Sequence, residues 1–277
     1  MNELYHHGIL GQRWGRRNGP PYPLNPSDRS IVEKKLSNNK DYGSNWWVEN
    51  TKEIKLNKDG SRTVPSGFKF NRVGSAEMRS NLSGGLYVSY GKADASRYVR
   101  NLGPSLCGKL MKQYGTHVQH ISVNKPLKLA SEQETINMTL NAMKEDPEYF
   151  NKLKDSWLYS MAYDPDHGIQ DSDLELALKD PTSKQAKKLA YSAMASFGNS
   201  DAAPYIAKIY DRFREKGYDA IPDVYDIMNG ISESAMIVLD TSKIELTDSR
   251  EITKDVYKEG KRFAKECGHL KVDDVLK

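Results

Sequence analysis

The chain of 277 residues has few cysteines and no long apolar run, and these absences exclude several classes of protein. Its two cysteines, Cys107 and Cys267, are too few for a disulfide framework and form no CxxC pair. No segment approaches the roughly 18 apolar residues of a membrane-spanning helix. The first charges are not followed by the apolar run of about 7 to 15 residues that a secretory signal needs. We therefore expect a soluble protein that starts out in the cytosol.

A large excess of one charge is also missing, and so are the motifs of several enzyme classes. The 41 basic and 37 acidic residues give a net charge of +4, too small to predict nucleic-acid binding over the whole surface. The chain has no GxxxxGK[ST] loop of a P-loop NTPase and no GxSxG motif to anchor a serine hydrolase triad. His117 and His120 stand three apart on an expected strand and so face opposite ways. No cysteine or carboxylate cluster lies near the pair His6–His7, and we expect no metal site.

The first 65 residues have the composition of a flexible arm. Four of the twelve prolines lie in the stretch NGPPYPLNPSD, and further turn-rich stretches follow it. A short helix is expected at 30–36, and the aromatic pair Trp46–Trp47 predicts that part of the arm docks on the body. The sequence thus divides into the arm (1–65), a mixed α+β domain (66–247) and a helical tail (248–277).

Hydrophobic periodicity distinguishes strands from helices beyond the arm. Alternating patterns and glycine turns predict strands at 66–75, 84–91, 116–130 with a break at Pro126, and 234–240. Apolar residues three and four apart predict helices at 93–103, in a helical insertion at 131–203, at 203–217 and at 251–268. No internal repeat is visible, which excludes a solenoid.

Three separated pieces of the sequence carry the residue types of one site. The first, FNRVGS, places Arg72 at the end of an alternating strand. The second, GGLYVSYGKADASRY, presents Tyr87 and Ser89 on a strand and Tyr98 on the helix that follows. The third, ISESAMIVLD, places a lone carboxylate, Glu233, at the mouth of a buried strand. Taken singly these residues also fit ordinary surface and core positions, but together and in this order they predict one functional site.

In this order the pieces resemble the three-part signature of ADP-ribosyltransferases, whose fold is a split β-sandwich that grips NAD between two small sheets. In the arginine-serine-glutamate branch of that family, the matching positions are Arg72, which would hold the dinucleotide, Ser89, which would support the site, and Glu233, which would be catalytic. The middle piece is also similar to the GxYF strand and SxxxxY helix of the poly-ADP-ribose polymerase branch. Tyr87 and Tyr98 match the tyrosines that sandwich the nicotinamide there.

The resemblance covers about 66–129 and 217–246, and it implies NAD as the substrate and no metal. Breaking the bond between ribose and nicotinamide builds positive charge on the sugar, which Glu233 would stabilise. Arg72 would offer a planar fork to the phosphates. Gly74 would let backbone groups approach the carboxamide closely.

The sequence also departs from both branches of the family. Arginine-modifying members carry Glu-x-Glu where this chain has Ile231-Ser232-Glu233, so the first carboxylate is missing and arginine is disfavoured as the acceptor. The Ser-Thr-Ser triplet is reduced to Ser89, which is followed by Tyr90. The predicted pocket is a hybrid of the two branches, and the acceptor stays open between protein, nucleic acid and small molecule.

The most specific pattern in the chain is LYHHGILGQRWGRRNG at 4–19. It is similar to an element, roughly HHGxxGxxWGxRR, found at the ends of otherwise unrelated proteins of tailed bacteriophages and prophages of Gram-positive bacteria. Glycines at these spacings disfavour a helix, and a tryptophan flanked by arginines has the composition of a binding hot spot. The predicted phage-docking motif consists of His7, Gly8, Gly11, Trp14, Gly15, Arg16 and Arg17. As an alternative, the same arginines form a basic tail that touches DNA weakly and without specificity.

Together these features predict a phage-encoded mono-ADP-ribosyltransferase-like protein that uses NAD to modify a host protein or other macromolecule. We expect it in the bacterial host cytoplasm, in the virion, or in both, with phage head or assembly proteins as partners of the arm and no membrane partner. The alternative is a non-catalytic head-associated protein that uses the arm and the insertion at 131–203 for assembly contacts.

Overall fold

The fold combines two β-sheets with a group of helices, which confirms the predicted α+β class. The structure, a computed structural model, describes residues 46–101, 117–156, 160, 163–164, 166–195, 201–223, 232 and 234–268. The phage-docking motif at 7–17, the helix expected at 30–36 and Glu233 lie outside the described residues. Across the described ranges, no helix has both the length and the apolar character needed to cross a membrane.

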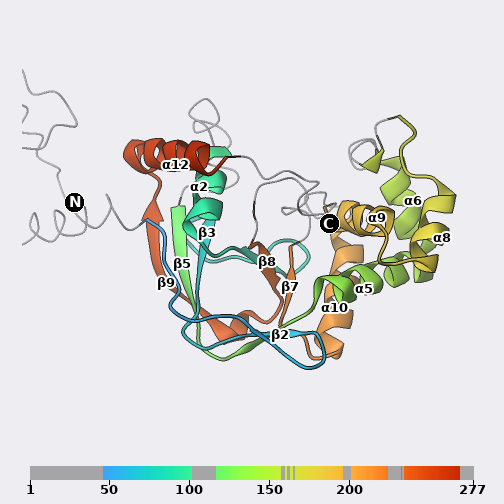
Figure 1. The fold of residues 1–277 in the computed structure, drawn as a ribbon, viewed down its shortest axis with the longest axis horizontal. Coiled ribbons are helices and arrows are strands. Elements are labelled where there is room, and N and C mark those ends of the chain that lie inside the picture. The colour runs from blue at the N-terminus through green and yellow to red at the C-terminus, as the bar shows by residue number, and fades with distance from the viewer. Residues whose placement is uncertain are drawn as a thin grey trace, which may run out of the picture. The chain divides into compact units, whose positions relative to one another are not determined.

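The strands form a mixed six-stranded sheet and an antiparallel three-stranded sheet (Figure 1). In spatial order the six-stranded sheet contains β1 (Lys55–Leu56), β2 (Arg62–Val64), β6 (Leu127–Leu129), β7 (Ala220–Pro222), β8 (Met236–Val238) and β4 (Leu86–Val88). The three-stranded sheet contains β3 (Lys69–Gly74), β5 (His117–Val123) and β9 (Ile244–Glu251). The pair β6–β7 is parallel, and the other neighbouring pairs are antiparallel. The expected buried strand at 234–240 is thus β8, which lies between β7 and β4.

The buried faces of the two sheets share one hydrophobic cluster. Phe70 and Ile121, which are cross-strand partners on β3 and β5, enter it from the three-stranded sheet. Leu86 and Val88 of β4 enter it from the six-stranded sheet. Because side chains alternate along a strand, Tyr87 faces the other way and packs against the helices. The two sheets therefore carry distinct inner and outer faces, and the inner face of β3 and β5 continues toward Arg72.

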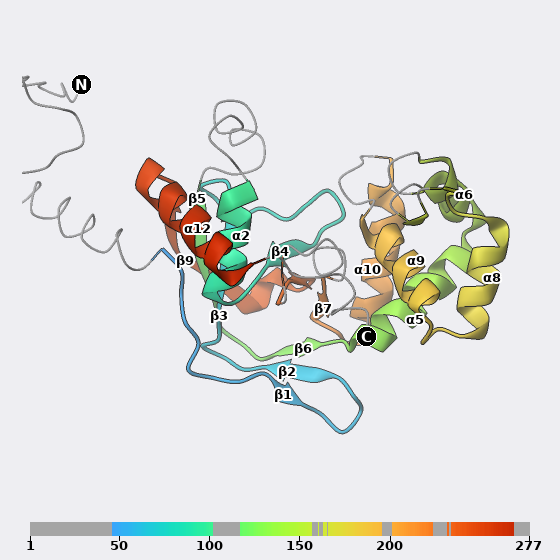
Figure 2. The ribbon, with the colours of Figure 1, turned by 45° about the horizontal axis from the view of Figure 1, so that its top comes forward.

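The helices follow the predicted pattern closely. They are α2 (Lys92–Asn101), α5 (Glu132–Glu145), α6 (Pro147–Asp155), α8 (Asp171–Lys179), α9 (Lys184–Ala195), α10 (Ala203–Glu215) and α12 (Lys254–Cys267), with a 3-10 turn η2 (Thr241–Lys243). Helices α5, α6, α8 and α9 lie in the expected insertion at 131–203 and gather with α10 into one helical group (Figures 1 and 2). Helix α5 begins at Ser131, whose side chain accepts a hydrogen bond from the Glu134 amide at 3.1 Å.

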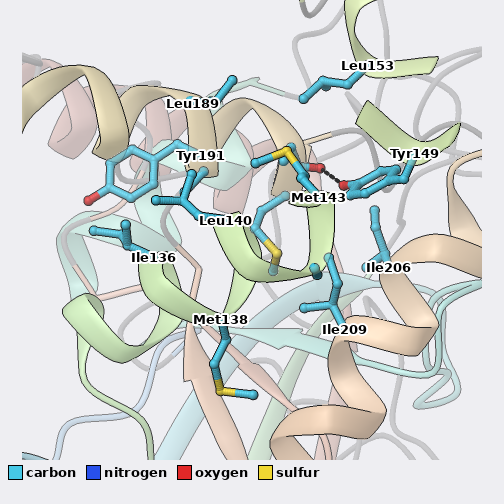
Figure 3. Close-up of a cluster of buried hydrophobic side chains, with 14 of the residues drawn as sticks. Ile136, Met138, Leu140, Met143, Tyr149, Leu153, Leu189, Tyr191, Ile206 and Ile209 are labelled. Atoms are coloured by element: carbon cyan, nitrogen blue, oxygen red, sulfur yellow. Dashed lines mark hydrogen bonds between the residues drawn. The ribbon is translucent and has the colours of Figure 1, made fainter. Parts of the chain in front are cut away.

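The helical group has its own hydrophobic core, shown in Figure 3. Leu140 of α5, Leu189 of α9 and Ile206 of α10 are all fully buried in it. Tyr149 of α6 is also buried, and its hydroxyl donates a hydrogen bond to the Ala193 carbonyl at 2.7 Å. Because α10 contributes to this core, the helical unit extends past the expected boundary at residue 203.

The folded unit begins earlier than the expected end of the arm at residue 65. Its first described residue is Trp46, and β1 and β2 form the edge of the six-stranded sheet, where β2 pairs with β6. Trp46 is fully buried, in agreement with the predicted docking of the aromatic pair. The sequence did not predict the hairpin of β1 and β2, because these strands span only two and three residues and are too short to show an alternating pattern.

Helices α2 and α12 lie side by side (Figures 1 and 2). A Cβ at Gly260 of α12 would lie 2.9 Å from a side-chain carbon of Val99 of α2, so glycine permits this close approach. Helix α12 begins at Thr253, whose side chain accepts a hydrogen bond from the Val256 amide at 3.3 Å. The tail helix predicted at 251–268 is therefore present and packed on α2 rather than free in solvent.

Candidate functional site

Arg72 lies on the inner face of β3, next to the cluster shared by the two sheets. Its Nη1 donates to the side-chain oxygen of Gln119 at 2.9 Å, and its Nη2 donates to the Arg79 carbonyl at 3.3 Å. Its Nε is buried and has no hydrogen-bond partner among the residues that the structure describes. Burial lowers the pKa of Arg72, and no neighbouring charge of the described residues contributes to that change. Arg72 is thus a partly buried cation, and a guanidinium of this kind suits an anionic ligand.

Gly74 ends β3, and its lack of a side chain makes room for Arg72. A Cβ at this position would overlap Nη1 of the guanidinium and lie 2.8 Å from its central carbon. The structure therefore gives Gly74 a packing reason that differs from the expected approach of backbone groups to a carboxamide. Its contact with a ligand stays a prediction.

Ser89 joins the first and second sequence pieces. Its amide donates to the Asn71 carbonyl at 2.9 Å, and the Asn71 amide donates to the Ser89 carbonyl at 2.7 Å. This bridge links the strand that carries Arg72 to the end of β4, and Ser89 is buried there. Two of the three predicted pieces are therefore direct neighbours.

Ser234 joins the third sequence piece to the second at Tyr90, the residue that follows Ser89. Its side-chain oxygen accepts a hydrogen bond from the Tyr90 amide at 3.1 Å and donates to the carboxylate of Asp94. The Ser234 amide donates to the same carboxylate at 3.2 Å and is 3.1 Å from the Ser232 hydroxyl. Ser232 and Ser234 are the chain neighbours of Glu233, so the structure fixes both flanks of this predicted catalytic residue.

Asp94 anchors this arrangement from the first turn of α2. It is almost fully buried and forms an ion pair with Arg97 at 3.3 Å, which is equally buried. Buried ion pairs need further hydrogen bonds to offset the lost hydration, and Ser234 supplies two of them. The beginning of β8 is therefore tied to the beginning of α2 by charged and polar contacts.

A cavity of about 320 Å³ opens beside these contacts. Tyr90 and Ser234 line it from one side, and Arg62 and Glu132 bring one charge of each sign. Burial raises the pKa of the Tyr90 phenol, and the nearby Arg62 guanidinium acts in the opposite direction. The floor is apolar and includes Met236 of β8. The cavity thus offers space for part of a ligand directly next to the flanks of Glu233.

Tyr87 lies on the opposite face of β4 from the cluster between the sheets. Its hydroxyl is 3.1 Å from that of Tyr210 on α10 and accepts a hydrogen bond from the Asn81 side chain at 2.9 Å. Burial raises the pKa of Tyr87 well above the ordinary phenol value. Tyr98 lies partly buried on α2, the helix that packs against β3 and α12. The structure thus places Ser89 opposite Asn71, the chain neighbour of Arg72, whereas it directs Tyr87 toward the helical group.

Two parts of the site carried no usable sequence signal. Gln119 is a fully buried polar residue in the β-type run HVQHISV, where alternation alone does not reveal its partner. Asp94 reads as an ordinary acidic residue in the first turn of a helix. Within the described ranges, no three His, Cys, Asp or Glu side chains gather in a way that would hold a metal ion.

No protein-family model, no curated protein and no solved structure matches the chain.

Proposed function

We propose that the protein is a mono-ADP-ribosyltransferase-like protein of phage origin that transfers ADP-ribose from NAD to a host macromolecule. The observation that carries the proposal is the joining of three distant sequence pieces. Asn71, beside Arg72, pairs with Ser89, and Tyr90, beside Ser89, pairs with Ser234. Pairing of these pieces is what a shared NAD site requires.

The arrangement of the two sheets supports the same proposal. A mixed sheet and a three-stranded antiparallel sheet share one hydrophobic cluster, and Arg72 lies where that cluster ends on β3. A split β-sandwich of the ADP-ribosyltransferase type places its dinucleotide between two such sheets. We therefore place the pyrophosphate of NAD at the Arg72 guanidinium, a partly buried cation beside this cluster.

The proposed reaction breaks the bond between C1′ of the ribose and the nicotinamide nitrogen. Nicotinamide leaves with the bonding electrons, and a nucleophile of the acceptor forms the new bond at C1′ and loses its proton. The sugar becomes positively charged on the way, and a carboxylate near the ribose stabilises that charge. Glu233 is our proposed carboxylate, because the next residue, Ser234, is anchored at Tyr90 and Asp94. Since the stretch Ile231-Ser232-Glu233 lacks the first of two carboxylates, we expect an acceptor other than arginine.

A label-transfer assay tests the proposed activity. Purified protein is incubated with NAD labelled in the adenylate part and with host lysate, and both macromolecular label and free nicotinamide are measured. Wild type is expected to release nicotinamide and transfer label, and Glu233→Ala is expected to lose both. Glu251→Ala, which removes an exposed glutamate from the end of β9, is the matched control and should behave as wild type. If wild type neither releases nicotinamide nor binds NAD, the alternative of a non-catalytic head-associated protein is favoured.

The proposed phage partner is tested separately from the catalytic site. A fusion that carries only Met1–Pro26 is expected to co-purify with phage heads or their assembly intermediates. The same fusion with Trp14→Ala and Arg16→Ala is the control and should not co-purify. Failure of the intact fusion to co-purify contradicts the docking role of this element.

A further inference from the structure

We infer that Gln119 is a positioning residue for Arg72, which it holds in the orientation that binds the pyrophosphate of NAD without neutralising its charge. The inference rests on the proposed function, because that function makes Arg72 the anion-binding residue.

The register of the three-stranded sheet places Gln119 directly opposite Arg72. The pair follows Phe70 and Ile121 along the same face, so both side chains point toward the space between the two sheets. Gln119 is fully buried, which is unusual for an uncharged polar side chain unless its hydrogen bonds are satisfied. Its burial therefore calls for partners at both ends of the amide.

Both ends of the Gln119 amide are occupied. Its nitrogen donates to the Ser75 carbonyl at 2.6 Å. Its oxygen accepts from Nη1 of Arg72 at 2.9 Å. Because an amide has one donor end and one acceptor end, the bond to Ser75 fixes the oxygen toward the guanidinium.

A neutral acceptor differs from a carboxylate in its effect on Arg72. A carboxylate at this position would pair with the guanidinium and cancel the charge that attracts an anion. The amide oxygen orients the same group and leaves its charge available. Gly74 and the Arg79 carbonyl complete the support, the first by making room and the second by accepting from Nη2.

The test measures the affinity for ADP-ribose by calorimetry, since ADP-ribose keeps the pyrophosphate and lacks the reacting bond. Gln119→Glu retains the size of the side chain and introduces a carboxylate beside Arg72. We expect its dissociation constant for ADP-ribose to rise roughly 10-fold to 100-fold, the range expected for a lost charge-assisted hydrogen bond. Ser122→Glu adds the same charge to the other face of β5, three residues away, and is the matched control expected to bind as wild type.

A double-mutant cycle distinguishes a positioning role from a structural one. Gln119→Met is expected to weaken ADP-ribose binding in the wild-type background and to have no further effect in an Arg72→Met background. Circular dichroism and thermal unfolding are recorded for every variant, and Gln119→Glu carries the test by itself if Gln119→Met does not fold. Equal affinities of wild type and Gln119→Glu, or an equal effect of Gln119→Met in both backgrounds, overturn the inference alone. Absence of ADP-ribose binding by wild type overturns the proposed function, and that outcome is distinct from the other two.

Discussion

Ser234 gives the sharpest prediction on stability, because one side chain holds the start of β8 against α2. The substitution Ser234→Ala removes the acceptor of the Tyr90 amide bond at 3.1 Å and the donor to the buried Asp94 carboxylate. A neutral hydrogen bond contributes about 1 kcal/mol and one to a charged group about 1.5–3 kcal/mol, so we expect a loss of about 2.5–4 kcal/mol in the free energy of unfolding. Asp94 keeps its ion pair with Arg97, which limits the loss to this range.

The assay is urea unfolding at neutral pH, with the free energy extrapolated linearly to water. Ser242→Ala is the matched control, because the Ser242 hydroxyl also donates to a carboxylate, that of Asp240 at 2.6 Å, but does so at the exposed surface. We expect the control to change the free energy by less than about 0.5 kcal/mol. A change of that small size for Ser234→Ala as well would refute the reasoning that this contact anchors the site.

Three further predictions follow from the described contacts. Gly74→Ala should displace the Arg72 guanidinium, lower the free energy of unfolding by about 1–3 kcal/mol in urea and weaken ADP-ribose binding; unchanged binding would contradict the placement of Arg72. Burial lowers the pKa of His120, so the stability that the neutral imidazole contributes is present above the unfolded pKa of about 6.5 and is lost as the pH falls below it. The free energy of unfolding, measured from pH 5 to 8, should therefore depend less on pH in His120→Gln than in wild type. An identical pH dependence of the two proteins would contradict this prediction. Trp46→Ala should lower the free energy of unfolding by about 3–5 kcal/mol, measured by thermal or urea unfolding. A near-neutral result would indicate that the segment before residue 65 does not pack on the body.

Much of the fold was predictable because local signals and tertiary packing agree. The turn pair Gly84–Gly85 precedes β4, and Gly84 adopts a positive φ of 83° that suits glycine. Pro126 separates β5 from β6, as a residue without an amide proton should. The helical insertion was recognisable from apolar residues three and four apart, which became the core of α5, α9 and α10.

Strand β9 was not predicted, and its composition explains why. Its run from Ile244 to Glu251 is mostly polar and contains four charged residues, Glu245, Asp248, Arg250 and Glu251. Among the described strands, β9 pairs with β5 alone and forms an edge of its sheet, where polar side chains can remain in contact with water. Its pairing partner, rather than its own pattern, makes it a strand, and the tail expected from residue 248 therefore begins inside a sheet.

Some residues of the candidate site could likewise be predicted from the local sequence, whereas others depend on partners far along the chain. Arg72 and Ser89 were recognisable because each stands on a short motif with a strand pattern. Gln119 and Asp94 act through partners 47 and 140 residues away, and nothing in their local sequence reveals those partners. Motifs thus indicated the residues that we propose to meet a ligand, whereas the residues that hold them could be found only from the structure.

Equilibrium titration of the protein with NAD tests the central claim, that Arg72 forms an NAD site where the three sequence pieces meet. We predict measurable binding by wild type, a loss of at least roughly tenfold in affinity for Arg72→Met, and no change for Arg79→Met, which removes an exposed guanidinium paired with Glu77. Equal affinities for wild type and Arg72→Met, or no binding by wild type, would contradict the account.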